Sequence, residues 1–284
     1  MTRTFLFVPG DSQRKFERAI TTAADALILD LEDSVAPARK PAARPLVRQM
    51  LAQVPATQQA WVRVNALDSG HLLQDLAAVM PARPYGIVLP KCQGREALLQ
   101  AAHYLDAFEA QAGLPQDSTR ILAIVTETAQ SIFGLGSYAH VTPRLWGLSW
   151  GAEDLAADVG SLGNRHQGRY TEPYRLARSL CLYAAAAAGV RAIDTVCVEL
   201  DEPTVLADEA QEACRDGFAG KLAIHPRHVE AINAAFTPDE SQLAWAARVL
   251  EAFERNPDAG TFNLDGKMID QPHLRLARRL MGRA

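Results

Sequence analysis

The feature that most constrains this sequence is a regular alternation of short aliphatic runs with longer segments of helical apolar spacing. This alternation is typical of βα units, in which each strand joins a parallel sheet and each helix covers it. The runs are Thr4–Val8, Ala26–Leu31, Trp61–Asn65, Tyr85–Leu89, Ile121–Thr126, Leu145–Trp150, Ala192–Val198 and Lys221–Ile224. Eight such runs predict an α/β protein built as a (β/α)₈ TIM-type barrel.

Helical spacing and capping residues predict helices between these runs. They cover Ser12–Thr22, Arg39–Gln53, Gly70–Met80, Gly94–Ala112, Thr171–Ala188 and Pro203–Asp216. A chain of 284 residues that is 48% hydrophobic can bury the core of one such barrel. After the eighth run come a further helix or two, a segment from Asn256 to Gly266 that contains Pro257 and two glycines, and a basic helix from Pro272 to Arg283. We therefore predict a catalytic barrel over residues 1–255 and a C-terminal helical extension over residues 256–284.

Net charge and cysteine spacing exclude several classes of partner. The formal net charge is −4 and the pI is near 6.0, so there is no overall basic field for nucleic acid or an anionic membrane. The four cysteines form no CxxC pair, which is typical of reduced thiols in a cytosol. The first apolar run is stopped by Pro9 and Gly10 and is too short for a signal peptide. We expect a cytoplasmic protein that binds neither nucleic acid nor membrane.

Charged and polar side chains gather where the predicted strands end. Strands of a barrel are covered on both faces, so a charge within one must be paired or lie at a mouth. The residues at these ends are Asp30, Glu32, Asp33, Arg63, Asn65, Lys91, Glu127, Glu153, Asp154 and His225. Because the carboxyl ends of barrel strands form the face on which active sites are built, we predict the site there.

Arg63 shares one strand face with Trp61 and Asn65, because side chains alternate along a strand, and it should point into the barrel mouth. One interpretation is an arginine that plugs the barrel and pairs with Asp30 or Glu32. The surplus of carboxylates favours a functional site, since like charges repel unless a cation or a shared proton offsets them. Carboxylate ligands without paired histidines or thiolates favour Mg²⁺, or Mn²⁺, over Zn²⁺.

Seven segments, in order, resemble the citrate lyase β-subunit family of the HpcH/HpaI aldolase superfamily. They read FLFVPGDSQRKFERA, ADALILDLEDSVAPARKPAAR, RVN, VLPK, ETAQSIFGL, WGAEDLAADVG and GFAGKLAIHPRHV. A later segment, GKMIDQP, resembles the C-terminal part of the citramalyl-CoA and malyl-CoA members. The resemblance extends from residue 5 to about residue 235, and it implies a TIM-type barrel that makes or breaks carbon–carbon bonds.

The resemblance also implies roles for the side chains at the mouth. Glu127 and Asp154 would bind Mg²⁺, and the metal would chelate the 2-oxo or 2-hydroxy acid part of the substrate. Arg63 would hold and polarise the same acid. Glu32 and Asp33 would act as supporting acids through metal-bound water.

Four residues near the N-terminus carry over from the family as candidates for binding coenzyme A. They are Phe7, Pro9, Arg14 and Arg18. Arg14 and Arg18 lie four residues apart on one helical face, which suits phosphate groups. Without the family motif, the same spacing is that of a solvated basic helix.

Asp270 is the general base that the resemblance implies, taking the hydroxyl proton in cleavage or an α-proton of acetyl-CoA in condensation. Its segment follows a complete barrel pattern and carries an amphipathic helix, for which Leu274, Leu276 and Leu280 are the expected anchors. We expect this extension to complete the active site of a neighbouring subunit in a homotrimer or a higher homo-oligomer. The alternative is that it packs on its own barrel and that Asp270 caps the last helix.

Together these features predict a lyase or synthase acting on a small 3-hydroxyacyl-CoA, such as malyl-CoA, citramalyl-CoA or citryl-CoA, with a 2-oxo acid as partner molecule. The same residues would serve a thioesterase on such esters, or a citryl-lyase subunit of a complex that uses an acyl-carrier protein. A pyruvate-type aldolase without coenzyme A would not need the FVPG segment and the basic helix. A non-enzymatic binding module would have lost one of Arg63, Glu127 and Asp154, all of which are present.

Overall fold

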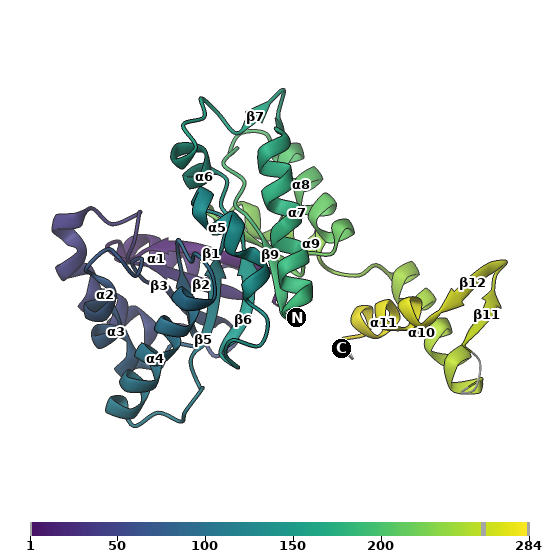
Figure 1. Ribbon diagram of the computed structural model, residues 1–284, viewed down its shortest axis with the longest axis horizontal. Helices are drawn as coiled ribbons and strands as arrows, with labels where there is room; N and C mark the ends of the chain where they lie inside the picture. Colours follow the sequence, from purple (N-terminus) through teal and green to yellow (C-terminus); the bar gives the residue numbers. More distant parts are fainter. Residues whose placement is uncertain (1, 257–259, 283–284) are drawn as a thin grey trace. The chain divides into compact units, whose positions relative to one another are not determined.

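A computed structural model describes residues 2–256 and 260–282, and the chain divides into two compact units after Phe236. The larger unit is a closed barrel of parallel strands with the order β1-β10-β9-β6-β5-β4-β3-β2 (Figure 1). The strands are β1 (Thr4–Pro9), β2 (Ala26–Asp30), β3 (Gln59–Arg63), β4 (Gly86–Leu89), β5 (Arg120–Ile124), β6 (Leu145–Ser149), β9 (Arg191–Asp194) and β10 (Gly220–Ala223). All eight predicted runs contribute a strand, so the predicted TIM-type barrel is confirmed.

Helices follow the strands, as a βα alternation requires. They are α1 (Gln13–Ala19), α2 (Lys40–Leu51), α3 (Leu72–Val79), α4 (Arg95–Ala112), α5 (Ala129–Gly134), α6 (Glu153–Asp158), α7 (Glu172–Ala187), α8 (Pro203–Asp216) and α9 (His228–Ala235). The six predicted helices correspond to α1, α2, α3, α4, α7 and α8. Across the described ranges, none of the helices combines the length and apolar character that crossing a bilayer requires.

The barrel interior is an aromatic and aliphatic core formed by every second residue of its strands. Phe5 and Trp146 contact Trp61 edge to face there, with ring centroids 6.2 and 5.3 Å from the indole. Gly86 makes room for this indole, because a Cβ at residue 86 would lie 2.4 Å from Trp61 Cζ3. Trp61 and Arg63 are separated by one residue on β3, so the strand that fills the interior also directs Arg63 toward the mouth.

Two hairpins are present that the sequence reading did not predict. The first, β7 (Arg165–His166) with β8 (Arg169–Tyr170), lies in the loop between α6 and α7. The second, β11 (Thr261–Leu264) with β12 (Lys267–Asp270), lies in the C-terminal unit. Asp265 and Gly266 link the second pair with φ values of 53° and 78°, the backbone geometry that favours Asp-Gly in a two-residue hairpin turn.

The C-terminal unit has its own small core, and this changes the predicted domain boundary. Helix α10 (Glu240–Arg255) was expected within the barrel domain, but Val249 and Phe253 pack with Ile269 and Leu274 of the tail. The unit therefore begins at Thr237 and includes α10 together with the hairpin and α11 (Gln271–Leu280). Of the expected anchors, Leu274 is buried and Leu280 packs against the same core, whereas Leu276 is 48% exposed.

Candidate active site at the barrel mouth

Arg63 and Asp30 form the base of a charged cluster at the carboxyl ends of β2 and β3. The two residues are paired in the strand register, and Arg63 Nε and Nη2 each donate to one Asp30 carboxylate oxygen at 2.7 Å. The guanidinium also lies over the Phe7 ring, 4.7 Å from its centroid. Although burial works to raise the pKa of Asp30, the charge and hydrogen bonds of Arg63 hold that pKa below its usual range. The pairing expected of a barrel plug is therefore present, and it fixes the orientation of the guanidinium.

The turn after β2 carries Glu32 and Asp33 over this pair. Asp30 shapes the turn by accepting from the backbone N–H groups of Glu32 at 2.9 Å and Ser34 at 3.1 Å. Lys40 Nζ supports the turn from α2 by donating to the Glu32 carbonyl at 2.7 Å. Glu32 is buried, with Oε2 lying 3.1 Å from Arg63 Nη1 but without a well-aligned hydrogen bond. The Asp33 side chain is 56% exposed, so it faces solvent at the rim of the mouth.

Glu127 follows β5 and is a second deeply buried carboxylate of the mouth, after Asp30. It is 3% exposed, and its Oε2 accepts from the backbone N–H of Lys91 at 2.5 Å. Burial raises the pKa of Glu127 to about 8, and the negative charges of Glu32 and Asp154 add to the increase. A negative charge at this position is therefore unfavourable until a cation offsets it.

Asp154 reaches the cluster from the first turn of α6, which follows β6. Its Oδ1 lies 3.4 Å from Lys91 Nζ, and the same ammonium lies 2.5 Å from Glu32 Oε1. The neighbouring Glu153 turns away, because Asn164 Nδ2 donates to its carboxylate at 2.8 Å. Of the two adjacent carboxylates, Asp154 alone therefore contributes to the cluster at Lys91.

The charge balance of this mouth suits a divalent cation. Five carboxylates meet two cationic groups, those of Arg63 and Lys91. Within residues 2–256 and 260–282, no three Asp, Glu, His or Cys side chains converge into a preformed metal cage. Mg²⁺ does not need such a cage, because it keeps several waters and binds through one or two carboxylates plus substrate oxygens. The donor set, with Glu127 destabilised by its neighbours, therefore fits Mg²⁺.

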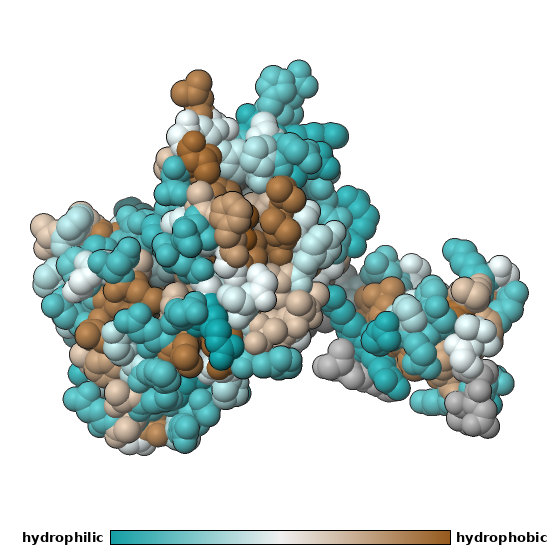
Figure 2. Space-filling view, viewed as in Figure 1, coloured by the Kyte–Doolittle hydropathy of each residue, from teal (hydrophilic) through white to brown (hydrophobic). Residues whose placement is uncertain are grey.

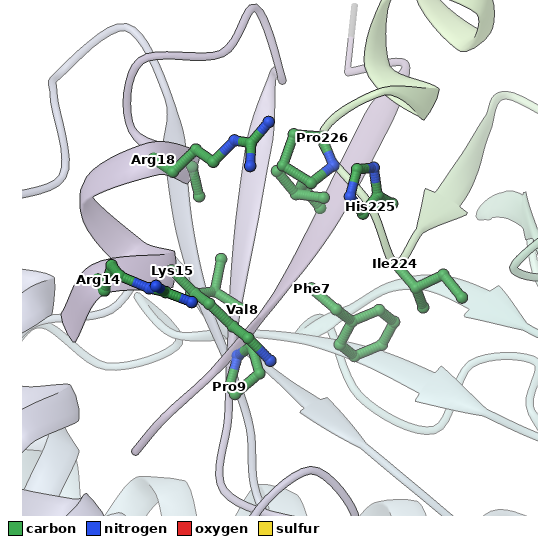
Figure 3. A pocket seen from close by; sticks show the side chains of 11 residues that line it. Phe7, Val8, Pro9, Arg14, Lys15, Arg18, Ile224, His225 and Pro226 are labelled. Atoms are coloured by element: carbon green, nitrogen blue, oxygen red, sulfur yellow. The ribbon is translucent and has the colours of Figure 1, made fainter. Parts of the chain in front are cut away.

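A pocket of about 490 Å³ lies beside the first strand, between α1 and the residues that follow β10 (Figure 3). All four residues predicted to bind coenzyme A line this pocket: Phe7, Pro9, Arg14 and Arg18. Lys15 adds a third cation that the prediction did not include, and His225 lies opposite the helix. The pocket therefore combines an aromatic ring with a row of basic side chains on one helix, which suits a ligand that carries phosphates.

Comparison with known proteins identifies the family of this barrel. Residues 3–226 match the family model described as HpcH/HpaI aldolase/citrate lyase. The chain belongs to this family. The resemblance that the sequence analysis predicted is therefore confirmed. The chain is an enzyme of the citrate lyase β-subunit type, a class of carbon–carbon lyases.

Three proteins show the range of the relatives. A (3S)-malyl-CoA thioesterase of Cereibacter sphaeroides is 35% identical over 289 residues, covering 99% of this chain and 94% of the relative. The mitochondrial citramalyl-CoA lyase of Rattus norvegicus is 28% identical over 293 residues, covering 98% and 85%. A crystal structure of CitE from Mycobacterium tuberculosis, in complex with magnesium, acetoacetate and coenzyme A, superposes with a TM-score of 0.78 at 33% identity, covering 99% and 97%.

Asp270 belongs to the C-terminal unit of this HpcH/HpaI lyase. It stands at the N-cap position of α11, and its Oδ1 lies 2.6 Å from His273 Nδ1. Asp270 therefore lies where the alternative prediction placed it, at the start of the last helix. Partial exposure of the Asp270 side chain leaves it able to contact a ligand or another chain.

Residues behind the mouth were missed by the sequence reading. Asp75, fully buried on α3, accepts from Asn65 Nδ2 at 2.6 Å, and Lys40 Nζ donates to Asn65 Oδ1 at 2.6 Å. Because β3 ends at Arg63, Asn65 lies beyond the strand and hydrogen-bonds to these two helical residues. The prediction that Asn65 shares a strand face with Arg63 was therefore wrong. The signal was present, since Asp75 shares the apolar face of α3 with Leu72, Leu76 and Val79.

Replacing Gly151 by alanine tests how closely this lyase holds Glu127. A Cβ at residue 151 would lie 2.8 Å from Glu127 Cγ, so the carboxylate must move. Backbone strain is not involved, because Gly151 has no positive φ value. We expect Gly151→Ala to lower turnover about 10–100-fold, since small misplacements of reacting groups cost that much. Steady-state kinetics measure this effect.

Gly163→Ala is the control, because no atom lies within 4 Å of a Cβ at that residue. Equal rates for the two variants would contradict the role of Gly151.

Proposed function

We propose that this protein is a magnesium-dependent lyase that breaks or forms the carbon–carbon bond of a small 3-hydroxyacyl-CoA. The observation that carries the proposal is the position of Phe7. This ring lines the basic pocket and also lies against the Arg63 guanidinium, 4.7 Å from it. A site for a phosphate-bearing ligand and a site for a small acid are thus adjacent, as a substrate with a nucleotide end and an acid end requires.

Glu127 and Asp154 would hold the metal, with Glu32 and Asp33 supporting it through bound water. Glu127 and Asp154 follow the neighbouring strands β5 and β6. Glu127 accepts from the backbone N–H of Lys91, and Asp154 lies beside the Lys91 ammonium. When bound, Mg²⁺ supplies Lewis-acid polarisation of the acid and of its oxo or hydroxyl oxygen, worth several kcal/mol in such sites. The magnesium in the crystal structure of the related CitE supports a metal ion as part of this proposal.

Arg63 would bind the carboxylate of the 2-oxo or 2-hydroxy acid. Asp30 occupies Nε and Nη2, and Nη1 lies between Glu32 at 3.1 Å and Asp33 at 3.8 Å. In cleavage, a base removes the proton of the 3-hydroxyl and the bond between the second and third carbons breaks. Its electron pair leaves as the enolate of the acetyl thioester, which takes up a proton, and the third carbon becomes the carbonyl of the 2-oxo acid.

Coenzyme A would lie in the pocket beside β1, with Phe7 and Pro9 toward the reacting end. Arg14 and Arg18, on adjacent turns of α1, would bind the phosphates, and Lys15 lies in the same wall. The relative with coenzyme A bound supports coenzyme A as the ligand, as do the CoA esters in the names of the two relatives.

Asp270 would serve as the base, contributed by the C-terminal unit of a neighbouring subunit in a homotrimer. Large apolar side chains on the barrel unit support an assembly, because Phe133 is 89% exposed and Leu162 110% exposed. Apolar patches reach the surface of this unit in Figure 2. A separate small unit with its own core can act on another subunit without unfolding.

Mixing two inactive variants tests this assignment. Asp270→Asn and Glu127→Gln subunits, exchanged at a 1:1 ratio into mixed oligomers, should recover up to about a quarter of wild-type activity if the two residues come from different chains. Each variant incubated with itself is the control for exchange conditions. No recovery, with mixed oligomers demonstrated by mass spectrometry, would place Asp270 and Glu127 in one chain.

A thioesterase is the second candidate function, and a specific relative favours it. The (3S)-malyl-CoA thioesterase is 35% identical over nearly the whole chain. Water admitted to the same metal site would attack the thioester, so hydrolysis and cleavage need nearly the same residues.

The experiment that tests the proposal is turnover of malyl-CoA, citramalyl-CoA and citryl-CoA, each with Mg²⁺ and again with excess EDTA. We expect one of these esters to yield acetyl-CoA and a 2-oxo acid, and EDTA to abolish the reaction. Turnover that produces only free coenzyme A and the intact hydroxy acid would establish the thioesterase instead. No metal-dependent turnover of any ester would refute both candidates.

A further inference from the structure

Lys91 stands at the centre of the carboxylate cluster with a backbone conformation that few lysines adopt. It follows β4 and Pro90, and its φ is +51°, in the left-handed region. For a residue with a Cβ this conformation costs about 1–2 kcal/mol. Such a cost persists where the surrounding structure holds the residue in place, and these positions cluster at functional sites.

The left-handed backbone lets Lys91 use both of its nitrogens on the cluster. Its N–H donates to Glu127 Oε2 at 2.5 Å, and its Nζ lies 2.5 Å from Glu32 Oε1. The same ammonium lies 3.4 Å from Asp154 Oδ1 and 3.9 Å from Asp33 Oδ2. One residue thus contacts every carboxylate of the mouth except Asp30, which Arg63 holds.

We propose that Lys91 is the internal counter-cation of this cluster, and that its ammonium competes with the divalent metal for Glu32 and Asp154. The inference rests on the proposed function only in assigning the metal to these carboxylates. Lys91 stabilises the mouth while the metal is away, and the metal must share or displace its contacts when it binds. Burial works to lower the pKa of Lys91, but the hydrogen bond and charge of Glu32 raise it above its usual range, so the ammonium stays charged.

Competition predicts an effect opposite to that of a supporting residue. Removing the ammonium should strengthen metal binding, because a like charge 3.4 Å from the Asp154 ligand oxygen no longer repels the metal. The same change should destabilise the metal-free protein, because the carboxylates lose their partner. A residue that merely packs in the mouth would destabilise both forms equally.

The test uses the whole protein and four variants. Lys91→Met removes the charge, and Lys91→Gly removes it with a residue that favours a positive φ. Lys91→Arg retains the charge. Arg83→Met is the matched control, since Arg83 is an exposed cation with a φ of +54° at the opposite end of β4. Titration calorimetry gives the Mg²⁺ Kd, and thermal unfolding is followed in EDTA and in saturating Mg²⁺.

We expect Lys91→Met and Lys91→Gly to bind Mg²⁺ about tenfold more tightly than wild type, an effect of one nearby charge. Their Tm in EDTA should fall by about 5 °C, and saturating Mg²⁺ should remove most of that deficit. Lys91→Arg and Arg83→Met should stay within about threefold of the wild-type Kd.

Weaker Mg²⁺ binding in both charge-removing variants, or a Tm deficit that Mg²⁺ leaves unchanged, would overturn the role of Lys91. Wild-type protein that bound no Mg²⁺ would instead refute the proposed function. In that event an unchanged Tm of Lys91→Gly in EDTA would also refute the counter-cation role, and a lowered Tm would support it.

Discussion

Glu127→Gln is expected to lower kcat by about 1000-fold, equivalent to ~4 kcal/mol, while leaving the fold at least as stable as that of the wild type. Glutamine retains an oxygen that can accept the Lys91 N–H, so the position is still filled and bonded. It removes a carboxyl group whose charged form burial, Glu32 and Asp154 all disfavour. Steady-state kinetics in Mg²⁺ and thermal unfolding in EDTA measure the two effects.

Two further variants make the Glu127 result specific. Asp154→Asn should be impaired to a similar degree, because it removes the other proposed metal ligand. Glu153→Gln should keep activity within about threefold of wild type, since Glu153 faces Asn164 and not the cluster. Full activity of Glu127→Gln, or of the wild type in excess EDTA, would refute the metal role.

Arg63→Lys should lower kcat/KM by about 100-fold or more, equivalent to ~2.7 kcal/mol. A lysine cannot make the two parallel bonds to Asp30 and also direct a donor toward Glu32, because its ammonium is a single point of charge. The substrate acid would then lose the Nη1 donor, whose direction the two bonds to Asp30 fix. Kinetics on the preferred thioester, together with calorimetric binding of the 2-oxo acid, report this loss directly.

Arg39→Lys is the matched control for Arg63→Lys. Arg39 pairs with Asp11 at 3.0 Å on the exposed surface, where an ion pair contributes about 0–1 kcal/mol. Its kcat/KM should be close to that of the wild type. If Arg63→Lys also retained wild-type kcat/KM, Arg63 would be a structural plug bound to Asp30, and the anchor of the substrate acid would lie elsewhere.

The barrel could be predicted from sequence because its strands are short, buried on both faces and separated by amphipathic helices. Short helices and hairpins were not predicted, because they depend on only a few residues. Helices α5 (Ala129–Gly134) and α6 (Glu153–Asp158) are too short to show a period, and β7 has two residues. The Asp265-Gly266 turn between β11 and β12 was detectable from its Asp-Gly pair, but the sequence analysis noted only that the segment contains Pro and Gly.

The sequence predicted which charged residues lie at the strand ends of the mouth, but not the hydrogen bonds and ion pairs that join them. The position of Arg63 followed from strand alternation, and the buried Asp30 pair follows from the register of β2 and β3. The left-handed turn at Lys91 could not be foreseen, because a lysine carries no signal for a positive φ. Lys40 and Asp75 lie on helices α2 and α3 behind the turn. The only sequence signal for them is that each is a charged residue within a buried helix face.

The central claim is that this mouth cleaves a carbon–carbon bond of a CoA ester, and the ratio of products in a single turnover tests it most directly. Excess enzyme with Mg²⁺ is mixed with the preferred thioester, quenched, and assayed for 2-oxo acid, acetyl-CoA and free thiol. We predict equal amounts of 2-oxo acid and acetyl-CoA, with little free thiol and no products in EDTA. Free thiol formed without any 2-oxo acid would contradict the account.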